Sequence, residues 1–404
     1  MQKLTIIADD LTGANDTGIQ FSKNGCTTMV IFDPENIEAL SPDKEVWSIN
    51  SDTRNLSRAQ AYSIVYKLAM SLRKGRTQQI YKKIDSTLRG HPGAEIEALM
   101  DAWEAPLAFV VPAFPANSRV VRDGSVYVNQ TLICHVPTVL QSEMSRKIGL
   151  IELDEIRQGT FYLRKQIIKA KKDKQVLVFD AVTEQDLETI SQTISQLPNK
   201  VIIAGSAGLA SYLSPFRSER ILDDTIPPTG IIMVVAGSHN SMTASQIKEL
   251  ASHIGQKPIW VNTNNILNGY LDFEQDRVFK EACQVIDYQC IILAVDSLIQ
   301  TSGQSIQKDV SSIVAVLGDI VKTIVSRVKP KALVVTGGDT SLQICKTLGA
   351  DGIRLTRELL RGIPLGYLVG GIADGTPIIT KSGGFGRHDS FVQLVNQLDW
   401  NMKK

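Results

Sequence analysis

Acidic, basic and hydroxyl side chains gather in three short segments of the first half of the chain. Asp9 and Asp10 follow the apolar run LTIIA, Arg54 lies in NSDTR after EVWSIN, and KKIDSTLRG continues a third β-branched run. Carboxylates accept hydrogen bonds from hydroxyl groups, and an arginine can hold a carboxylate through two parallel N–H bonds. Such a set of donors and acceptors suits a small polyhydroxy acid better than an apolar ligand.

These segments predict a substrate site. Two adjacent aspartates cannot both point into a core, so at least one is expected to face a ligand or to cap the helix that begins near Thr12. Alternation along the strand sends Lys82 to one side and Lys83 to the other, and one of these two lysines is expected to be solvated. The candidate substrate-binding residues are Asp9, Asp10, Arg54, Lys83, Asp85, Ser86, Thr87 and Arg89.

Three glycine-rich turns mark the second half. They are VVAGSHNS (Val234–Ser241), VVTGGDTS (Val334–Ser341) and TKSGGFGR (Thr380–Arg387), and each follows an apolar run. Free backbone N–H groups at such turns, and the positive ends of the helices that follow the first two, would face an anion. Together they predict a site for nucleotide phosphates, with Lys381 and Arg387 adding positive charge. The alternative is that these glycines only form helix caps and tight turns.

Short β-branched runs alternate with segments of helical apolar spacing. This alternation predicts an α/β fold of two domains, each with a mainly parallel sheet flanked by helices, and a ligand cleft between them. Ligands of such sheets lie beyond the carboxyl ends of the strands, which is where the motifs fall. The expected helices include Arg58–Leu72, Ala94–Trp103, Met242–Ile254, Ser311–Val328 and Ser341–Leu348.

The length of 404 residues favours two domains. A Pro-Pro pair with polar neighbours in Ile221–Gly230 predicts the boundary. We therefore expect a substrate domain over 1–222, a linker over 223–229 and a nucleotide domain over 230–404. The segment PAFPANSR (Pro112–Arg119) predicts a rigid loop that closes over the substrate or holds the domain interface.

Composition excludes several classes of partner. With 43 basic and 42 acidic residues the formal net charge is +1, so no field that recruits nucleic acid or an anionic membrane is expected. The five cysteines are scattered, which argues against a disulfide framework or a zinc site. The start, MQKLTIIADD, fits neither a signal peptide nor a membrane span, and a cytoplasmic location is expected.

Six motifs stand in order along the chain: IADDLTGANDTG, YKKIDSTLRG, PAFPANSR, AGSHN, GGDTS and KSGGFG. Together they resemble the four-carbon acid sugar kinase family. The resemblance implies an N-terminal acid-sugar-binding domain, a C-terminal nucleotide-binding domain and ATP-dependent phosphorylation of the C4 hydroxyl of D-threonate, D-erythronate or a 3-oxo-tetronate. NDTGIQ is more similar to the D-threonate kinases than to the oxo-tetronate branch. The nucleotide contacts that the resemblance implies are Ser238, Gly337, Gly338, Asp339, Gly383, Gly384, Phe385 and Gly386.

The chain carries neither the P-loop pattern GxxxxGK[ST] nor the protein-kinase HRD and DFG set. Phosphoryl transfer still needs an anchored polyphosphate and a neutralising metal, so ATP and Mg²⁺ are the expected cofactors. Asp339 is a candidate general base or a water-mediated metal ligand, and Asp10 and Asp85 compete for the role of base. No residue is assigned as a direct metal ligand.

Two other classes of protein stay open from the residues alone. One is a two-lobed sugar-acid-binding protein without catalysis, against which the three glycine-rich turns argue. The other is a dehydrogenase, which would need GxGxxG between a strand and a helix, and GGFGR is not that pattern. The expected partners are a sugar acid and ATP, with no nucleic acid and no membrane, and homodimer formation is left open.

Overall fold

The structure is a computed structural model that describes residues 4–33, 45–74, 77–197, 201–213, 225–227, 229–238, 240–285, 290–296 and 310–398. The chain divides into two compact units, Met1–Ile221 and Leu222–Lys404. The predicted boundaries at 222 and 230, with the linker 223–229, fall beside this division; residues 223, 224 and 228 lie outside the described residues. In each unit the predicted mainly parallel sheet flanked by helices is confirmed, while the ligand cleft stays a prediction.

The described strands of the first unit's main sheet are all parallel to their neighbours. Continuous apolar runs such as Leu4–Ala8 form its centre, because helices cover both faces of a parallel sheet. In spatial order the strands are β2 (Thr28–Ile31), β3 (Val46–Asn50), β1 (Leu4–Ala8), β4 (Gln79–Lys83), β11 (Val201–Gly205), β5 (Leu107–Val111), β10 (Val176–Phe179) and β9 (Ile148–Ile151).

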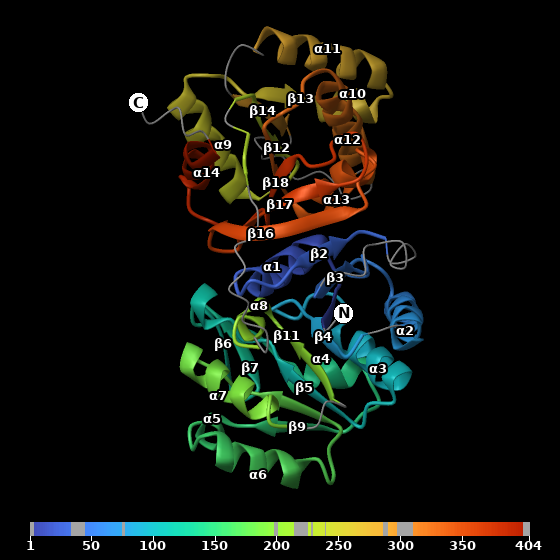
Figure 1. Ribbon diagram of the computed structural model, residues 1–404, viewed down its shortest axis with the longest axis vertical. Coiled ribbons are helices and arrows are strands. Elements are labelled where there is room, and N and C mark those ends of the chain that lie inside the picture. Colours follow the sequence, from blue (N-terminus) through green and yellow to red (C-terminus); the bar gives the residue numbers. More distant parts are fainter. Residues whose placement is uncertain are drawn as a thin grey trace. The chain divides into compact units, whose positions relative to one another are not determined.

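Helices flank this sheet on both faces. Lys82 and Lys83 are adjacent on β4 and reach α3 and α1 respectively, which places these two helices on opposite faces. Helix α2 packs beside α3 (Figure 1). The helices of this unit are α1 (Leu11–Ser22), α2 (Arg58–Lys74), α3 (Pro92–Trp103), α4 (Val136–Glu143), α5 (Leu153–Ile156), α6 (Thr160–Ala170), α7 (Glu184–Ile194) and α8 (Ala207–Ala210).

A small antiparallel sheet follows the loop after β5. Its strands are β6 (Arg119–Arg122), β7 (Ser125–Val128) and β8 (Thr131–His135), in that spatial order. The sequence analysis missed this sheet because its strands have only four or five residues each, too few for a clear alternating pattern. In PAFPANSR, Pro115–Asn117 forms a 3₁₀ turn directly before β6.

The sheet of the second unit is parallel in five strands and antiparallel at β17 and β16. Strand β16, with β-bulges in its pairing to β17, was not predicted. In spatial order the strands are β13 (Ile259–Val261), β14 (Cys290–Val295), β12 (Ile232–Ala236), β15 (Ala332–Thr336), β18 (Pro377–Lys381), β17 (Ile363–Val369) and β16 (Gly352–Leu360).

Helices α9 and α14 lie side by side on one face of this sheet, where Leu250 and Phe391 join the core formed by Val234 and Ile379 (Figure 1). The expected helices are confirmed to within about three residues at their ends. None of the described helices is long and apolar enough to cross a bilayer. The helices of this unit are α9 (Ser241–Ile254), α10 (Thr263–Leu267), α11 (Leu271–Gln284), α12 (Val310–Arg327), α13 (Gly338–Thr347) and α14 (Ser390–Leu398).

Candidate substrate and nucleotide sites

The three charged segments of the first unit meet at one edge of its sheet. Strand β1 lies between β3 and β4, and its last residue, Ala8, is in register with Asn50 and with Lys83. Parallel strands end at the same edge, so the residues that follow them emerge together. The structure thereby brings Asp9, Arg54 and Asp85 into one cluster.

Arg54 is at the centre of this cluster. Its Nε donates to Asp9 Oδ2 at 2.7 Å and its Nη2 donates to Asp9 Oδ1 at 2.8 Å, while Nη1 donates to Asp10 Oδ2. Asp85 Oδ2 lies 3.9 Å from Nη2. The expected two-bonded arginine–carboxylate pair is therefore present, but Asp9 of the chain supplies the carboxylate. This corrects the expectation that the Arg54 fork is open to a ligand.

The two adjacent aspartates have different environments. Asp10 caps α1 by accepting from the Gly13 amide at 2.8 Å, as expected for one of the pair, and Asp9 is buried. Burial raises the pKa of Asp9, but the positive charges of Arg54 and Lys82 outweigh it and leave this pKa below its usual value. Burial raises the pKa of Asp10, and Arg54 offsets the increase only in part. Asp10 is thus the more basic carboxylate of the two.

The loop after β4 is folded around Asp85. This carboxylate accepts from the Thr87 amide at 2.9 Å, from the Thr87 hydroxyl and from Arg89 Nη2 at 2.7 Å. Burial raises the pKa of Asp85, but these donors outweigh it and hold the pKa well below its usual range. The Arg89 side chain is 66% exposed, and Ser86 lies in the same loop. Asp85 is therefore an acceptor rather than a base.

Gly90 ends this loop with a φ of +83°, and a Cβ there would lie 3.0 Å from Asp9 Oδ2. A left-handed backbone favours glycine, and here the neighbouring carboxylate also excludes a side chain. Gly90 therefore lets the loop close against the Asp9–Arg54 pair.

Both lysines of β4 are buried, which corrects the expectation that one is solvated. Lys83 Nζ lies 3.9 Å from Asp16 Oδ1 on α1, and a Cβ on Gly13 would come within 2.9 Å of the same nitrogen. The ammonium group therefore lies beside the first turns of α1, close to Asp10. Burial raises the pKa of Asp16 to about 6. The sequence analysis missed Asp16, although it stands in the first motif, in ANDTG.

Lys82 supports the cluster from the other face of the sheet. Its Nζ lies 2.8 Å from Glu95 Oε2, and Glu95 also accepts from the Thr53 hydroxyl next to Arg54. Burial raises the pKa of Glu95, and Lys82 opposes this. The sequence analysis missed Glu95. One signal was available in the sequence: Glu95 lies one turn before Leu99 on the apolar face of a helix. A carboxylate buried on such a face needs a cation as its partner.

The three glycine-rich turns of the second unit also converge, because β12, β15 and β18 are neighbours in its sheet. The Gly337 amide donates to the Lys381 carbonyl at 2.9 Å, and a Cβ on Gly383 would clash with Ser238 Oγ. Gly338 begins α13, and Asp339 is exposed in its first turn. The structure therefore places the turns AGS, GGD and SGGFG side by side, whereas His239 lies outside the described residues.

The Lys381 side chain binds the loop that follows it rather than extending toward a ligand. Its Nζ donates to the carbonyls of Ser382 at 2.8 Å, Gly383 at 3.2 Å and Phe385 at 3.1 Å, and the side chain is buried. This corrects the expectation that Lys381 contacts phosphates directly. The side chain of Arg387, in contrast, is 79% exposed.

The residues at the turns are compatible with Mg²⁺. No group of three or more histidine, cysteine, aspartate or glutamate side chains among the described residues could hold a metal by itself. Mg²⁺ with a nucleotide is commonly bound through one or two carboxylates, the phosphates and several waters. Asp339, which is exposed, offers one such carboxylate.

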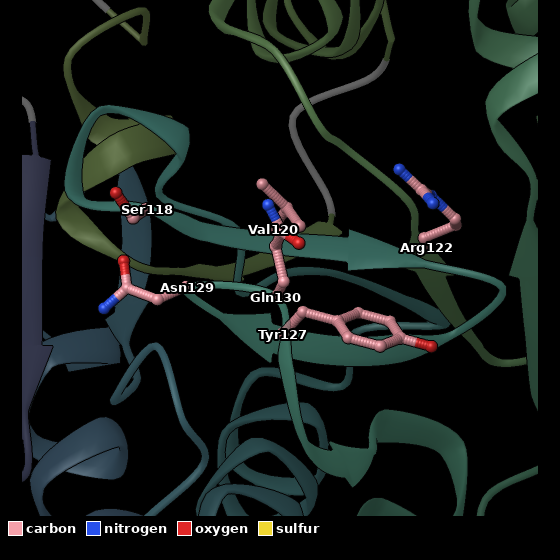
Figure 2. Close-up of a pocket in the computed structure, with 6 residues that line it drawn as sticks. All are labelled: Ser118, Val120, Arg122, Tyr127, Asn129 and Gln130. Carbon is pink, nitrogen blue, oxygen red and sulfur yellow. The ribbon is translucent and has the colours of Figure 1, made fainter.

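The small antiparallel sheet bears a separate hollow of about 580 Å³ (Figure 2). Arg122 is the one cation of its lining, and no acidic residue lines it. Close to this sheet, Cys134 Sγ lies 3.9 Å from the Thr87 carbonyl oxygen. None of the predicted substrate residues lines the hollow, which is formed by Ser118, Val120, Arg122, Tyr127, Asn129 and Gln130.

Comparison with known proteins gives the two units different descriptions. The family profile described as "Sugar-binding N-terminal domain" matches residues 4–213, and that described as "Nucleotide-binding C-terminal domain" matches residues 233–391. A crystal structure from Salmonella typhimurium described as a putative tRNA synthase has a TM-score of 0.79 at 21% identity and covers 99% of this chain and 100% of its own. A Haemophilus influenzae structure of the DUF1537 family has a TM-score of 0.72 at 19% identity, with 98% and 100% covered. These two structures share the fold.

The relatives of known activity that match this chain are kinases of four-carbon sugar acids. D-threonate kinase of Salmonella typhimurium is 30% identical, with 98% of each chain covered, and D-threonate kinase of Bordetella bronchiseptica is 30% identical, with 97% of this chain and 96% of the relative covered. D-erythronate kinase of Heliobacterium modesticaldum is 29% identical, with 98% and 97% covered. The chain is a phosphotransferase with a nucleotide-binding domain. It belongs to the four-carbon acid sugar kinase family, as the six motifs predicted.

Proposed function

We propose that the chain transfers the γ-phosphoryl group of ATP to the 4-hydroxyl of D-threonate, with Mg²⁺, in the cytoplasm. The observation that carries the substrate class is the cluster of Asp9, Asp10, Arg54 and Asp85 at the edge of the first sheet. Fixed carboxylates beside cations match a ligand with several hydroxyls and one carboxylate. The relatives at 30% identity are D-threonate kinases, which supports this substrate before the others.

On the substrate side, we assign the carboxylate of the sugar acid to Lys83 and Arg89. Lys83 has Asp16 at 3.9 Å, beyond hydrogen-bond distance. Arg89 donates to Asp85 through Nη2 and has further N–H groups on a side chain that is 66% exposed. Arg54 serves to hold Asp9 and Asp10 so that their remaining lone pairs accept from substrate hydroxyls. Ser86 and Thr87 supply further polar contacts from the same loop.

The general base follows from the same electrostatics. An acceptor hydroxyl needs a carboxylate that gains a proton readily, and a loose phosphoryl-transfer transition state needs only modest base strength. The raised pKa of Asp10 favours it over Asp85, whose pKa is lowered. Asp10 is therefore the proposed base, and Asp339 the residue that holds Mg²⁺ through water. The metal, when bound, neutralises charge on the transferred phosphoryl group.

The nucleotide contacts are proposed as the backbone groups of the three adjoining turns. Ser238, Gly337 and Gly338 flank the loop Gly383–Gly386, in which Phe385 stands between two glycines. Amide donors at the ends of parallel strands bind phosphates without a charged side chain.

An ADP-release assay over D-threonate, D-erythronate and 3-oxo-tetronate tests the proposal, since relatives with each of these activities match the chain. We expect the highest kcat/KM with D-threonate and no turnover without Mg²⁺. Turnover of another of these acids alone would overturn only the choice of substrate. No turnover with any of them, by a folded protein, would overturn the proposed reaction. Light scattering in solution tests homodimer formation, which stays a prediction.

A further inference from the structure

The loop 382–387 has its carbonyl groups bound from the interior. Lys381 Nζ holds the carbonyls of residues 382, 383 and 385. Two side chains of α9 add to this: Thr243 Oγ1 donates to the Gly383 carbonyl at 3.0 Å, and Gln246 Nε2 donates to the Phe385 and Arg387 carbonyls at 3.1 Å and 2.8 Å. The carbonyl oxygens of this loop therefore point toward the core of the unit.

The amide groups of the same loop are differently placed. Phe385 N donates to the Ser382 carbonyl at 3.1 Å and Arg387 N donates to Ser390 Oγ at 2.7 Å, within the loop and its following helix. Within the described part of the chain, the amides of Gly383, Gly384 and Gly386 have no such acceptor. Neighbouring amides without an internal acceptor can form a concavity that binds anions, and here the buried ammonium group of Lys381 binds the carbonyls of the same loop.

We propose that Lys381 is a positioning residue for nucleotide binding: its buried ammonium group draws the loop carbonyls inward and thereby presents the amides of Gly383, Gly384 and Gly386 to a phosphate. The inference rests on the proposed function, because it assumes that this loop receives the nucleotide. It differs from a direct lysine–phosphate contact, since the Lys381 side chain is buried and its donors are already used.

The environment of Lys381 disfavours its protonated form, so a bound anion would change how much of the side chain is protonated. Burial lowers the pKa of Lys381 to about 7, and no charged group contributes to this shift. Helix α9 presents the neutral Thr243 and Gln246, and α14 presents the Phe391 ring, 5.5 Å from Nζ. A phosphate bound to the outward amides would favour the ammonium form, so nucleotide binding takes up a proton above pH 7. The titratable residues of the adjoining turns are exposed or half-buried: Asp339, Arg387, His388 and Asp389.

Lys381→Met tests the proposal, with Lys248→Met, an exposed lysine of α9, as the matched control. Affinity for a nonhydrolysable ATP analogue with Mg²⁺ is measured by calorimetry from pH 6 to pH 9. We expect wild-type affinity to weaken about tenfold as the ammonium loses its proton. We expect Lys381→Met to bind about tenfold or more weakly at pH 6 and to show no such pH dependence, with D-threonate affinity unchanged. The control should behave as wild type.

A second measurement needs no variant. Calorimetry of the wild-type protein at pH 8 in two buffers of different ionisation enthalpy should show proton uptake on nucleotide binding. Absence of uptake, or a folded Lys381→Met protein with wild-type affinity and pH profile, would overturn the inference while leaving the kinase function intact. A wild-type protein that binds no nucleotide at any pH would overturn the proposed nucleotide site and this inference with it.

Discussion

Arg54 holds Asp9 through two parallel hydrogen bonds, Nε to Oδ2 at 2.7 Å and Nη2 to Oδ1 at 2.8 Å. The same guanidinium reaches Asp10, so one cation fixes both carboxylates at the end of β1. Such bidentate pairs are among the strongest hydrogen-bonded contacts and set the orientation of both partners. Arg54 therefore orders the acceptors of the proposed substrate site, which is a different task from binding the substrate carboxylate itself.

Arg54→Ala should accordingly affect both stability and substrate binding. Removing one partner of a mostly buried ion pair leaves Asp9 without its counter-charge, and we expect a loss of about 2 to 4 kcal/mol in the free energy of unfolding. D-threonate affinity should fall by about tenfold or more, with ATP affinity of the folded protein unchanged. Arg54→Lys should not restore binding, because lysine cannot make the paired contact.

Arg164→Ala, an exposed arginine of α6, is the matched control for stability. Surface substitutions usually change the free energy of unfolding by less than about 0.5 kcal/mol, so its unfolding curve in urea should stay close to wild type. If Arg54→Ala were as stable as this control and lost D-threonate binding alone, Arg54 would be a direct ligand after all.

Asp16 gives a stability prediction with a definite pH dependence. Its pKa is raised by burial from 3.8 to about 6, so between these values the folded state keeps a proton that the unfolded state loses. Wild-type stability should therefore fall as pH rises from about 4 to about 6 through this group. At pH 7 and above, Asp16→Asn should be about 1 to 3 kcal/mol more stable than wild type.

Urea unfolding at pH 4, 5.5 and 7.5 checks this, with the exposed Asp319→Asn of α12 as control. The control should change the free energy of unfolding by less than about 0.5 kcal/mol at each pH. A loss of stability in Asp16→Asn at pH 7.5 would show that attraction to Lys83 exceeds the cost of burial.

The Lys82–Glu95 pair should behave as a unit. Glu95→Met removes the carboxylate partner of a fully buried ammonium group, which among the described residues then keeps hydrogen bonds to the Ile7 and Lys83 carbonyls at 3.2 Å and 3.0 Å. We expect a loss of about 3 to 5 kcal/mol in the free energy of unfolding. The double variant Lys82→Met/Glu95→Met should recover much of that loss, because no unpaired charge remains. A double-mutant cycle in urea measures the coupling, and additive losses would contradict it.

The sequence predicted that the residues of the proposed substrate site would meet, because their convergence follows from the order of the strands. Asp9, Arg54 and Asp85 each follow an apolar strand, and adjacent parallel strands end at one edge, so their convergence needs no knowledge of side-chain packing. The pairing within the cluster could not be predicted in the same way. From the sequence, Arg54 could bind either a carboxylate of the chain or the carboxylate of a ligand. In the structure the positions of the loops bring it to Asp9.

Other features depend on packing between elements that are distant in sequence. Glu95 meets Lys82 only because α3 covers that face of β4, and Gln246 of α9 reaches Phe385, 139 residues further on. The strands β6–β8, of four or five residues each, are too short to show a clear alternating pattern. These contacts follow from how helices are placed on the sheets, which local spacing does not determine.

Gly384 offers the cleanest test of the nucleotide site. The sequence alone could not separate a glycine needed for a tight turn from one needed for ligand approach. In the structure, Gly384 has no left-handed backbone, and a Cβ there would lie 3.4 Å from Asn240 Nδ2. Gly255, at the end of α9, has a φ of +68° and nothing within 4 Å of a Cβ. A substitution at Gly255 strains the backbone away from the loop 382–387, so the two glycines separate backbone strain from ligand binding.

Gly384→Val should fold with a free energy of unfolding within about 1 kcal/mol of wild type and yet lose measurable affinity for an ATP analogue, because its side chain would project where a phosphate must approach the amides. Gly255→Val should instead lose stability by about 1 to 3 kcal/mol through backbone strain and keep its nucleotide affinity. Calorimetric titration of both folded variants, with D-threonate binding as the internal check, distinguishes the two effects. Unaltered nucleotide affinity in Gly384→Val would remove this loop from the proposed site.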